Sequence, residues 1–186
     1  MIKTIKRLTS LLLAGVLLTA LLSACGAEQR VPSNADAVDP STSPVRPLNE
    51  AVFSDSDLTL VNVFATWCSP CIQEIPDLQE LQETMRDRGV QVIGVVLDTL
   101  NPDGTINTDA MASAQDLIEL AEVSYPFYIP DTLSWDGALT TITSVPTTFF
   151  VDRDGTIVSG AYVGARDLDS WTEIVETELA NLEAAA

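Results

Sequence analysis

Apolar residues along the chain occur in two patterns, short unbroken runs and positions with helical spacing. Residues 58–65 (LTLVNVFA) and 90–97 (VQVIGVVL) are runs rich in β-branched residues, which predicts two buried strands. The stretch between them has apolar residues three or four positions apart and stops at Gly89, which predicts a helix. The apolar positions of this helix are Ile72, Ile75, Leu78, Leu81 and Met85.

The second half of the chain continues the alternation. A polar loop at residues 101–104 (NPDG) leads to a helix that we expect at residues 109–122. Residues 147–163 carry two apolar runs on either side of an Asp-Gly pair, which predicts a β-hairpin, and a last helix is expected at residues 167–182. This order of elements predicts an α/β fold with a mixed sheet flanked by helices.

The N-terminal region has the pattern of an export signal followed by a linker. Three basic residues precede a short apolar stretch at residues 11–22, and LSAC at residues 22–25 resembles the bacterial lipobox, whose cysteine is acylated after cleavage. We therefore expect a signal peptide at residues 1–24 and a lipid anchor on Cys25 at the extracytoplasmic face of a bacterial membrane. An uncleaved membrane anchor is the alternative. Residues 25–47, rich in proline and serine, predict a flexible linker, and residues 48–183 the folded domain.

Charge excludes one class of partner. The chain has 9 basic and 27 acidic residues, a formal net charge of -18, and three of the basic residues lie in the expected signal peptide. A surface this acidic repels phosphate backbones, so we expect no binding to nucleic acid. Solubility, or adaptation to a cation-rich medium, is the simplest reason for the acidity.

Cysteine chemistry is the main functional signal. The chain has three cysteines and no histidine. With Cys25 assigned to lipid, Cys68 and Cys71 remain as a pair, and the loop they close is too short to stabilise a domain much. A zinc site needs more ligands than this pair, and covalent haem attachment needs a histidine where Ile72 stands, so we expect no metal and no cofactor. The pair is therefore predicted to be reactive.

The position of the pair explains how it could react without histidine. Cys68 follows a strand and begins a helix, and Pro70 suits the first helical turn. Free N–H groups and the helix dipole favour a thiolate at Cys68, which would bring the thiol pKa from about 8.5 to near 7. We expect Cys68 to be an exposed nucleophile that attacks a substrate disulfide, and Cys71 to resolve the mixed disulfide.

Three ordered motifs, VNVFATWCSPCIQEIPDLQEL, YPFYIPD and SVPTTFFVDRDGTIV, resemble the thioredoxin superfamily, and most closely its TlpA/ResA-like, membrane-tethered branch. The resemblance covers residues 47–182. It implies a thioredoxin-like three-layer sandwich with a central mixed β-sheet, a helical insertion at residues 98–123, and thiol-disulfide oxidoreductase activity with Cys68 attacking and Cys71 resolving.

The resemblance also implies roles for residues around the pair. Pro146 matches the cis-proline of the family, which leaves the backbone of Val145 free to pair with substrate. Trp67 matches the tryptophan that shields one side of the site, with simple packing as the alternative. Trp135 and Trp171 are interpreted as packing residues.

Two further positions concern protons. Asn62 stands where thioredoxins carry a buried aspartate, and an amide cannot exchange protons. Glu74 matches a glutamate near the active site of ResA-like proteins, and we hypothesise that it raises the pKa of Cys71 or accepts its proton. A solvated helix residue is the alternative for Glu74.

The expected function is reduction of disulfides in exported proteins, with electrons from a membrane thiol donor by analogy with the family. A thiol oxidant, a peroxiredoxin-like peroxidase and a non-catalytic binding lipoprotein are the alternatives. Residues Ser69 and Pro70 between the cysteines do not decide the direction of electron flow, because the reduction potentials of such pairs range from about -270 to -120 mV.

Overall fold

The computed structural model describes residues 43–131 and 134–185. The expected signal peptide, the lipidation site Cys25 and most of the expected linker lie outside the described residues. Among the helices that are described, none is both long enough and apolar enough to cross a membrane.

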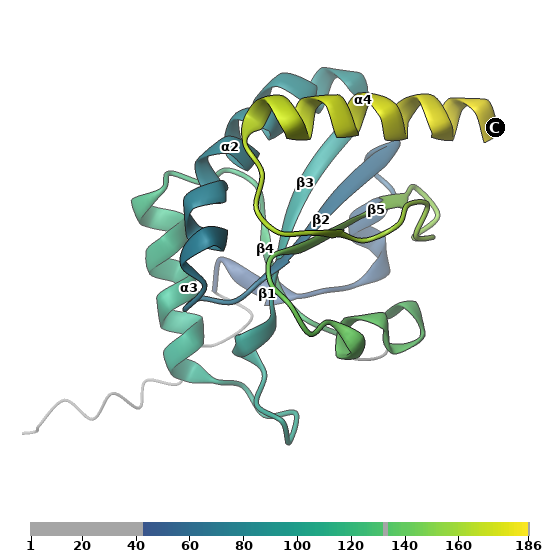
Figure 1. Ribbon diagram of the computed structural model, residues 1–186. Coiled ribbons are helices and arrows are strands. Elements are labelled where there is room, and N and C mark those ends of the chain that lie inside the picture. Colours follow the sequence, from purple (N-terminus) through teal and green to yellow (C-terminus); the bar gives the residue numbers. More distant parts are fainter. Residues whose placement is uncertain (1–42, 132–133, 186) are drawn as a thin grey trace, which may run out of the picture. The chain divides into compact units, whose positions relative to one another are not determined.

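A six-stranded mixed sheet forms the centre of the described domain (Figure 1). β2 and β3 are its long central strands, with parallel pairing, and β5 pairs with β2 in the antiparallel direction. In spatial order the strands are β1 (Val45–Pro47), β4 (Phe127–Ile129), β3 (Val90–Val96), β2 (Leu58–Phe64), β5 (Thr147–Asp152) and β6 (Tyr162–Val163). The predicted α/β fold with a mixed sheet is confirmed.

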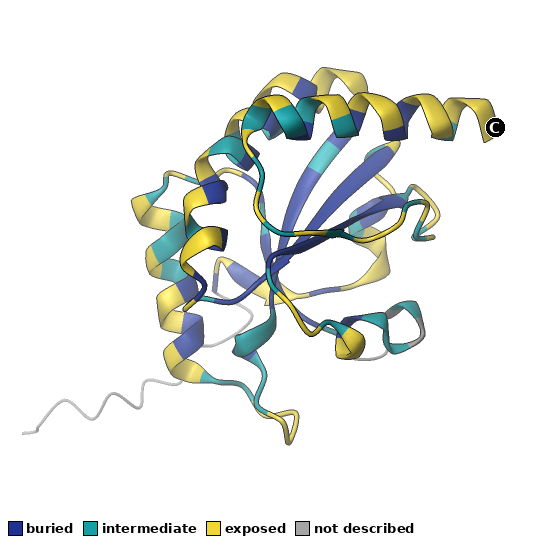
Figure 2. Cartoon of the chain, in the orientation of Figure 1, coloured by how far each residue is buried: buried dark blue, intermediate teal, exposed yellow. Residues whose placement is uncertain are grey.

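Two hydrophobic layers cover the two faces of this sheet. Leu60 on β2 and its partner Val92 on β3 face the core shared with the α-helices, whereas Val61 and Ile93 face the opposite core. Because side chains alternate along a strand, a run that is apolar at every position must be buried on both faces. Figure 2 shows the consequence, with central strands buried and helices exposed on their outer sides.

The described α-helices share one core, and 3-10 helices cover the other. α2 (Ser69–Met85), α3 (Thr108–Leu120) and α4 (Leu168–Ala185) all contribute to the first core. The 3-10 helices η1 (Glu50–Phe53) and η4 (Ser134–Thr141) supply Phe53 and Leu139 to the second. Helix α3 belongs to the predicted insertion. The layered arrangement expected from the resemblance is therefore confirmed.

Helix α2 ends as its sequence predicts. A short 3-10 turn, η2 (Arg86–Arg88), follows it, and Gly89 then takes a left-handed conformation with φ of 77°. A Cβ at Gly89 would also clash with a carboxylate oxygen of Asp57. Glycine meets both requirements, since it tolerates positive φ and carries no side chain.

Strand β1 shortens the expected linker. Its three residues pair in parallel with β4, and Val45 is fully buried. We expected a flexible coil as far as Pro47, because proline and serine dominate this stretch. Three residues are too few to show a strand period, so only pairing with a distant strand reveals β1.

The predicted hairpin at residues 147–163 forms only in part. The chain turns at Gly155, whose φ is 81°, and Val151 and Ile157 form an isolated bridge. Beyond the bridge the returning chain leaves the ladder, and the hydroxyl of Ser159 accepts the hydrogen bond of the Phe150 N–H at 2.8 Å. Pairing resumes only at the two-residue strand β6. A side-chain acceptor thus replaces part of the second strand.

Candidate active site

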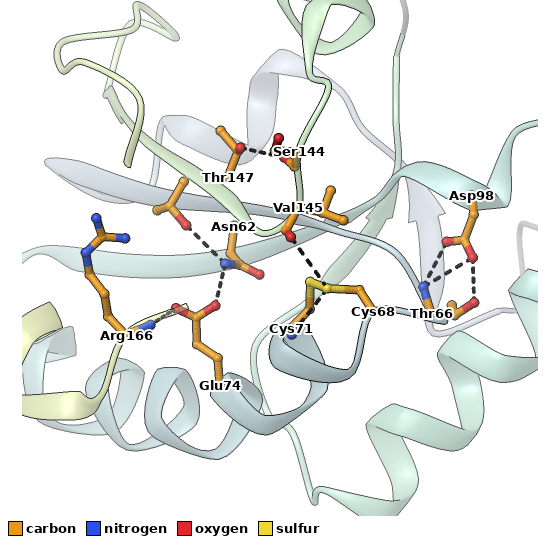
Figure 3. The surroundings of a disulfide bond; sticks show 11 residues. Asn62, Thr66, Cys68, Cys71, Glu74, Asp98, Ser144, Val145, Thr147 and Arg166 are labelled. Atoms are coloured by element: carbon orange, nitrogen blue, oxygen red, sulfur yellow. Dashed lines mark hydrogen bonds between the residues drawn. A yellow bond between two sulfur atoms is a disulfide. The ribbon is translucent and has the colours of Figure 1, made fainter. Parts of the chain in front are cut away.

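The cysteine pair lies between β2 and α2, where the sequence predicts it. Cys68 is the N-cap of α2, and its sulfur accepts a hydrogen bond from the Cys71 N–H at 3.3 Å. The two residues form a disulfide with an S–S distance of 2.01 Å and a Cα–Cα distance of 5.3 Å (Figure 3). Pro70 lies in the first turn of the helix, where its missing N–H costs no hydrogen bond.

Cys68 is less accessible than expected. Its exposed fraction is 5% in the disulfide form, and that of Cys71 is 1%. The expectation of an exposed nucleophile is therefore wrong for the oxidised protein, because Cys68 lies in the same buried cluster of side chains as Cys71. The neighbouring Trp67 is 73% exposed, which contradicts the alternative that it is simply packed.

The loop before β5 contacts the disulfide on the side away from α2. The peptide bond between Val145 and Pro146 is cis, which confirms the expectation from the resemblance. The carbonyl oxygen of Val145 lies 3.7 Å from the sulfur of Cys68 (Figure 3). The carbonyl oxygen of Pro146 accepts a hydrogen bond from the Gly164 N–H at 2.9 Å, so the segment after β6 supports the loop.

Glu74 is buried and not solvated, with an exposed fraction of 2%. One carboxylate oxygen accepts hydrogen bonds from the Trp171 indole N–H at 2.6 Å and the Arg166 backbone N–H at 3.0 Å. The other oxygen accepts one from the Asn62 amide at 3.3 Å. The alternative interpretation of Glu74 as a solvated helix residue is therefore wrong. Its suggested role toward Cys71 stays a prediction.

Opposing effects act on the ionisation of Glu74. Burial raises its pKa above the ordinary value of 4.5, while the donors Arg166, Trp171 and Asn62 and the charge of Arg166 lower it in part. The guanidinium of Arg166 lies over the ring of Trp171, 5.1 Å from its centroid. A small cleft next to α2 leads to this group, lined by Pro70, Gln73, Glu74, Asp77, Ala165, Arg166 and Asp167. A carboxyl group with a raised pKa beside such a cleft is suited to exchange protons.

Asn62 links three elements beneath the disulfide. Besides its bond to Glu74 on α2, its amide donates to the hydroxyl of Thr148 on β5 at 3.0 Å. The residue is almost fully buried on β2. Its amide thus holds Glu74 in place. As the residue type predicts, the amide carries no charge and does not take up or release a proton.

Sequence reasoning missed three contributors to the site. Trp171 is fully buried, as expected of a packing residue, but it also donates to Glu74. Arg166 supplies a backbone donor to the same carboxylate, and Asp98, at the end of β3, accepts hydrogen bonds from Thr66 in the turn before Cys68. No sequence signal indicates these contacts, because the partners are between 32 and 97 positions apart.

Metal binding has no support in the part of the chain that the structure describes. No group of three or more His, Cys, Asp or Glu side chains there is arranged to hold an ion.

Known proteins resemble this chain in sequence and in structure. The profile of the AhpC/TSA family matches residues 45–159. Thiol-disulfide oxidoreductase ResA of Bacillus cereus is 24% identical over 98 residues, and thiol:disulfide interchange protein DsbE of Allochromatium vinosum is 32% identical over 129 residues. The crystal structure of a thiol:disulfide interchange protein of the thioredoxin family from Chlorobium tepidum TLS superposes with a TM-score of 0.57 at 28% identity, covering 72% of this chain and 87% of that one.

The extent of these matches differs. The ResA match covers 53% of this chain and 50% of the relative, and the DsbE match covers 68% and 62%. The chain thus spans about half to three fifths of the length of these curated relatives. The family profile covers well over half of the chain and includes both cysteines, Glu74 and Pro146. The chain therefore belongs to the AhpC/TSA family and has the thioredoxin-like fold.

Proposed function

We propose that this protein is a thiol-disulfide oxidoreductase that exchanges disulfides through Cys68 and Cys71. The observation that carries the proposal is the Cys68–Cys71 disulfide at the N-terminus of α2, with the Val145 carbonyl beside it. The names of the relatives support the same chemistry.

The helix N-terminus activates the first cysteine. The N–H of Cys71 points at the Cys68 sulfur, and the positive end of the helix dipole lies at the same place. The dipole stabilises a negative charge there by about 0.3–1 kcal/mol, and by up to ~2 kcal/mol when the site is partly buried. After reduction of the disulfide, Cys68 therefore carries more thiolate at neutral pH than a free cysteine does.

Disulfide exchange then takes two steps. The Cys68 thiolate attacks a substrate disulfide, forms a mixed disulfide and releases one substrate thiolate, which takes up a proton. Cys71 loses its proton, and its thiolate attacks the Cys68 sulfur, which restores the internal disulfide and releases the second substrate thiol. The two electrons of the dithiol pass to the substrate. The reverse sequence oxidises a substrate dithiol.

Reduction of insulin by the purified domain tests the proposal. With dithiothreitol as electron source, we expect the protein to accelerate insulin precipitation and Cys68→Ser to abolish the acceleration. Cys71→Ser should instead accumulate a mixed disulfide between Cys68 and substrate, visible on a non-reducing gel. Equal rates for the wild type and Cys68→Ser would disprove the assignment. Rapid turnover of hydrogen peroxide without insulin reduction would favour the peroxiredoxin-like alternative.

We further propose that the protein works as a reductant. Titration with glutathione measures the reduction potential of the pair and so tests the direction of electron flow. The reduction potentials of known Cys-x-x-Cys pairs span ~150 mV, or roughly 7 kcal/mol for two electrons. A potential near -270 mV is that of a reductant such as thioredoxin, and one near -120 mV is that of a strong oxidant. If the intact cysteine pair exchanges with no disulfide at all, the alternative of a non-catalytic binding lipoprotein is favoured.

The proposed location is the extracytoplasmic face of a bacterial membrane, with a lipid on Cys25. The basic start, the apolar stretch at residues 11–22 and the LSAC motif support this location. Exported proteins with disulfides are then the substrates, and a membrane thiol protein is the electron donor. Radiolabelled palmitate should label the wild type and leave Cys25→Ser unlabelled. Label on both proteins, or on neither, contradicts the proposal.

A further inference from the structure

The turn that carries Cys68 is held by a carboxylate from another part of the chain. Asp98 lies in η3 (Leu97–Thr99), at the end of β3. The Thr66 backbone N–H donates to both carboxylate oxygens of Asp98, at 3.0 Å to Oδ1 and 3.2 Å to Oδ2. The Thr66 hydroxyl donates to Oδ2 at 2.5 Å (Figure 3). Hydrogen bonds to an ionised acceptor are stronger than neutral ones.

Thr66 is well placed to pass this restraint on to the nucleophile. It lies two residues before Cys68, and the Cys68 N–H donates to the Ala65 carbonyl at 3.0 Å, which closes the turn around Thr66. Two residues of extended chain reach at most ~7 Å, so a shift of Thr66 moves Cys68 as well. Trp67, between them, is largely exposed and gives the turn little packing support.

Asp98 is itself held in place by its neighbours. The hydroxyl of the fully buried Thr99 donates to the Val96 carbonyl at 2.6 Å, and the Leu100 N–H donates to the Leu97 carbonyl at 3.4 Å. These contacts fix the backbone on both sides of Asp98. The carboxylate therefore meets Thr66 from a rigid base.

We propose that Asp98 is a positioning residue for the Cys68–Cys71 pair, which it acts on by holding Thr66 and, through it, the turn that presents Cys68. The inference rests on the proposed disulfide chemistry and deepens it. Residue 98 begins the segment that the resemblance predicts to be an insertion, so this segment would have a direct role at the active site.

Two effects of Asp98 on the reduction potential have the same sign. A fixed turn keeps the two sulfurs close, which favours the disulfide over the open dithiol. The negative charge of the carboxylate disfavours a thiolate in the reduced form, which also favours the disulfide. Loss of Asp98 should therefore raise the reduction potential of the pair.

Asp103, in the loop that follows η3, provides a matched control. It accepts hydrogen bonds from the backbone N–H and the hydroxyl of Thr105 at 3.0 and 2.6 Å, but these bonds stay within its own exposed loop. Asp103→Ala thus removes one charge and one local set of bonds without touching the turn before Cys68.

The experiment measures the equilibrium with glutathione and the amide exchange of Thr66 in four proteins, the wild type and three variants. We expect Asp98→Ala to change the equilibrium constant about tenfold, or ~30 mV, toward the dithiol, with at least roughly tenfold faster exchange at Thr66. Asp98→Asn keeps an acceptor for the Thr66 N–H, so a change of about threefold, or ~14 mV, and near-normal exchange are expected. Asp103→Ala should match the wild type.

Equal potentials in Asp98→Ala and Asp103→Ala would overturn the proposal. A shifted potential in Asp98→Ala with unchanged Thr66 exchange would overturn it too, because the loss of the acceptor would then act without loosening Thr66. If Asp98→Ala does not fold, Thr66→Val decides: it removes the hydroxyl donor and should shift the equilibrium in the same direction about threefold, and no shift contradicts the proposal. These measurements use no protein substrate. If the domain fails to reduce insulin but shows these shifts, the proposed function is refuted and the role of Asp98 is not.

Discussion

The indole N–H of Trp171 on α4 donates a 2.6 Å hydrogen bond to the carboxylate of Glu74 on α2, across 97 positions of sequence. Both residues are buried, and α4 packs against α2 at this point. The bond gives a carboxyl group beneath the disulfide a fixed orientation and a strong donor. It therefore ties the last helix of the fold to the group that we expect to handle a proton of the cysteine pair.

The buried position of Glu74 predicts a pH-dependent stability. Because burial raises the pKa of Glu74 above 4.5 in the folded protein, the folded state keeps this proton to higher pH than the unfolded chain does. The contribution of Glu74 to stability is thus fully present below about pH 4.5 and is lost as pH rises through the folded pKa. Glu74→Gln cannot lose a proton, so its free energy of unfolding should rise relative to wild type between about pH 4 and 8. Urea titrations across this range measure the difference.

Asp77→Asn is the control for that series. Asp77 lies one turn further along α2 and lines the same cleft, so the substitution removes one charge without removing the buried carboxyl. Its unfolding free energy should follow that of wild type at every pH. A difference between Glu74→Gln and wild type that stays constant across pH would show that Glu74 does not titrate as described.

Glu74→Gln also tests the suggested link to Cys71. A nearby carboxylate disfavours a second negative charge, so its removal should let Cys71 react with an alkylating agent at lower pH. Alkylation of the reduced Cys68→Ser protein as a function of pH isolates this thiol. An unchanged profile would separate Glu74 from the chemistry of Cys71 and leave it a structural role.

Trp171 and Trp67 should respond to substitution in opposite ways. Trp171→Phe removes a donor from a buried carboxylate, which should lower the free energy of unfolding by roughly 1–3 kcal/mol. Trp67→Ala affects a side chain that is mostly in solvent, so stability should stay within about 0.5 kcal/mol of wild type. If Trp67 contacts substrate, as we expect, losing about 1 kcal/mol of binding would slow insulin reduction roughly fivefold. Chemical unfolding and the insulin assay together check both variants, and a destabilised Trp67→Ala with normal activity would contradict this assignment.

Gly94 in β3 is expected to tolerate no side chain. A Cβ there would lie 2.8 Å from the ring of Phe127 and 3.1 Å from that of Phe64, in the packed core. Gly94→Ala should therefore lower the free energy of unfolding by about 1–3 kcal/mol. A Cβ at Gly160 would meet nothing within 4 Å, so Gly160→Ala should change stability by less than about 0.5 kcal/mol. Thermal unfolding of both variants compares them, and similar midpoints would mean that the two rings can move apart.

Much of the fold could be predicted from local patterns. The runs that became β2 and β3 are apolar at nearly every position, and the helical spacing before Gly89 matches α2. Strand β1 was harder to predict because three residues show no periodicity. Its partner β4 lies far along the chain, so only the assembled sheet defines it. The hairpin predicted at residues 147–163 is right in its ends, since β6 pairs with β5, but not in its middle.

The active site divides in the same way. The sequence by itself determined the reactive pair and its place at a helix N-terminus, because the cysteines, Pro70 and the preceding strand are neighbours along the chain. Only the tertiary structure decided that Cys68 is nearly buried, that Glu74 is held by Trp171 and Arg166, and that Asp98 holds Thr66. Burial and hydrogen bonding depend on which distant segments the folded sheet and helices bring together. No local pattern of residue types specifies those contacts.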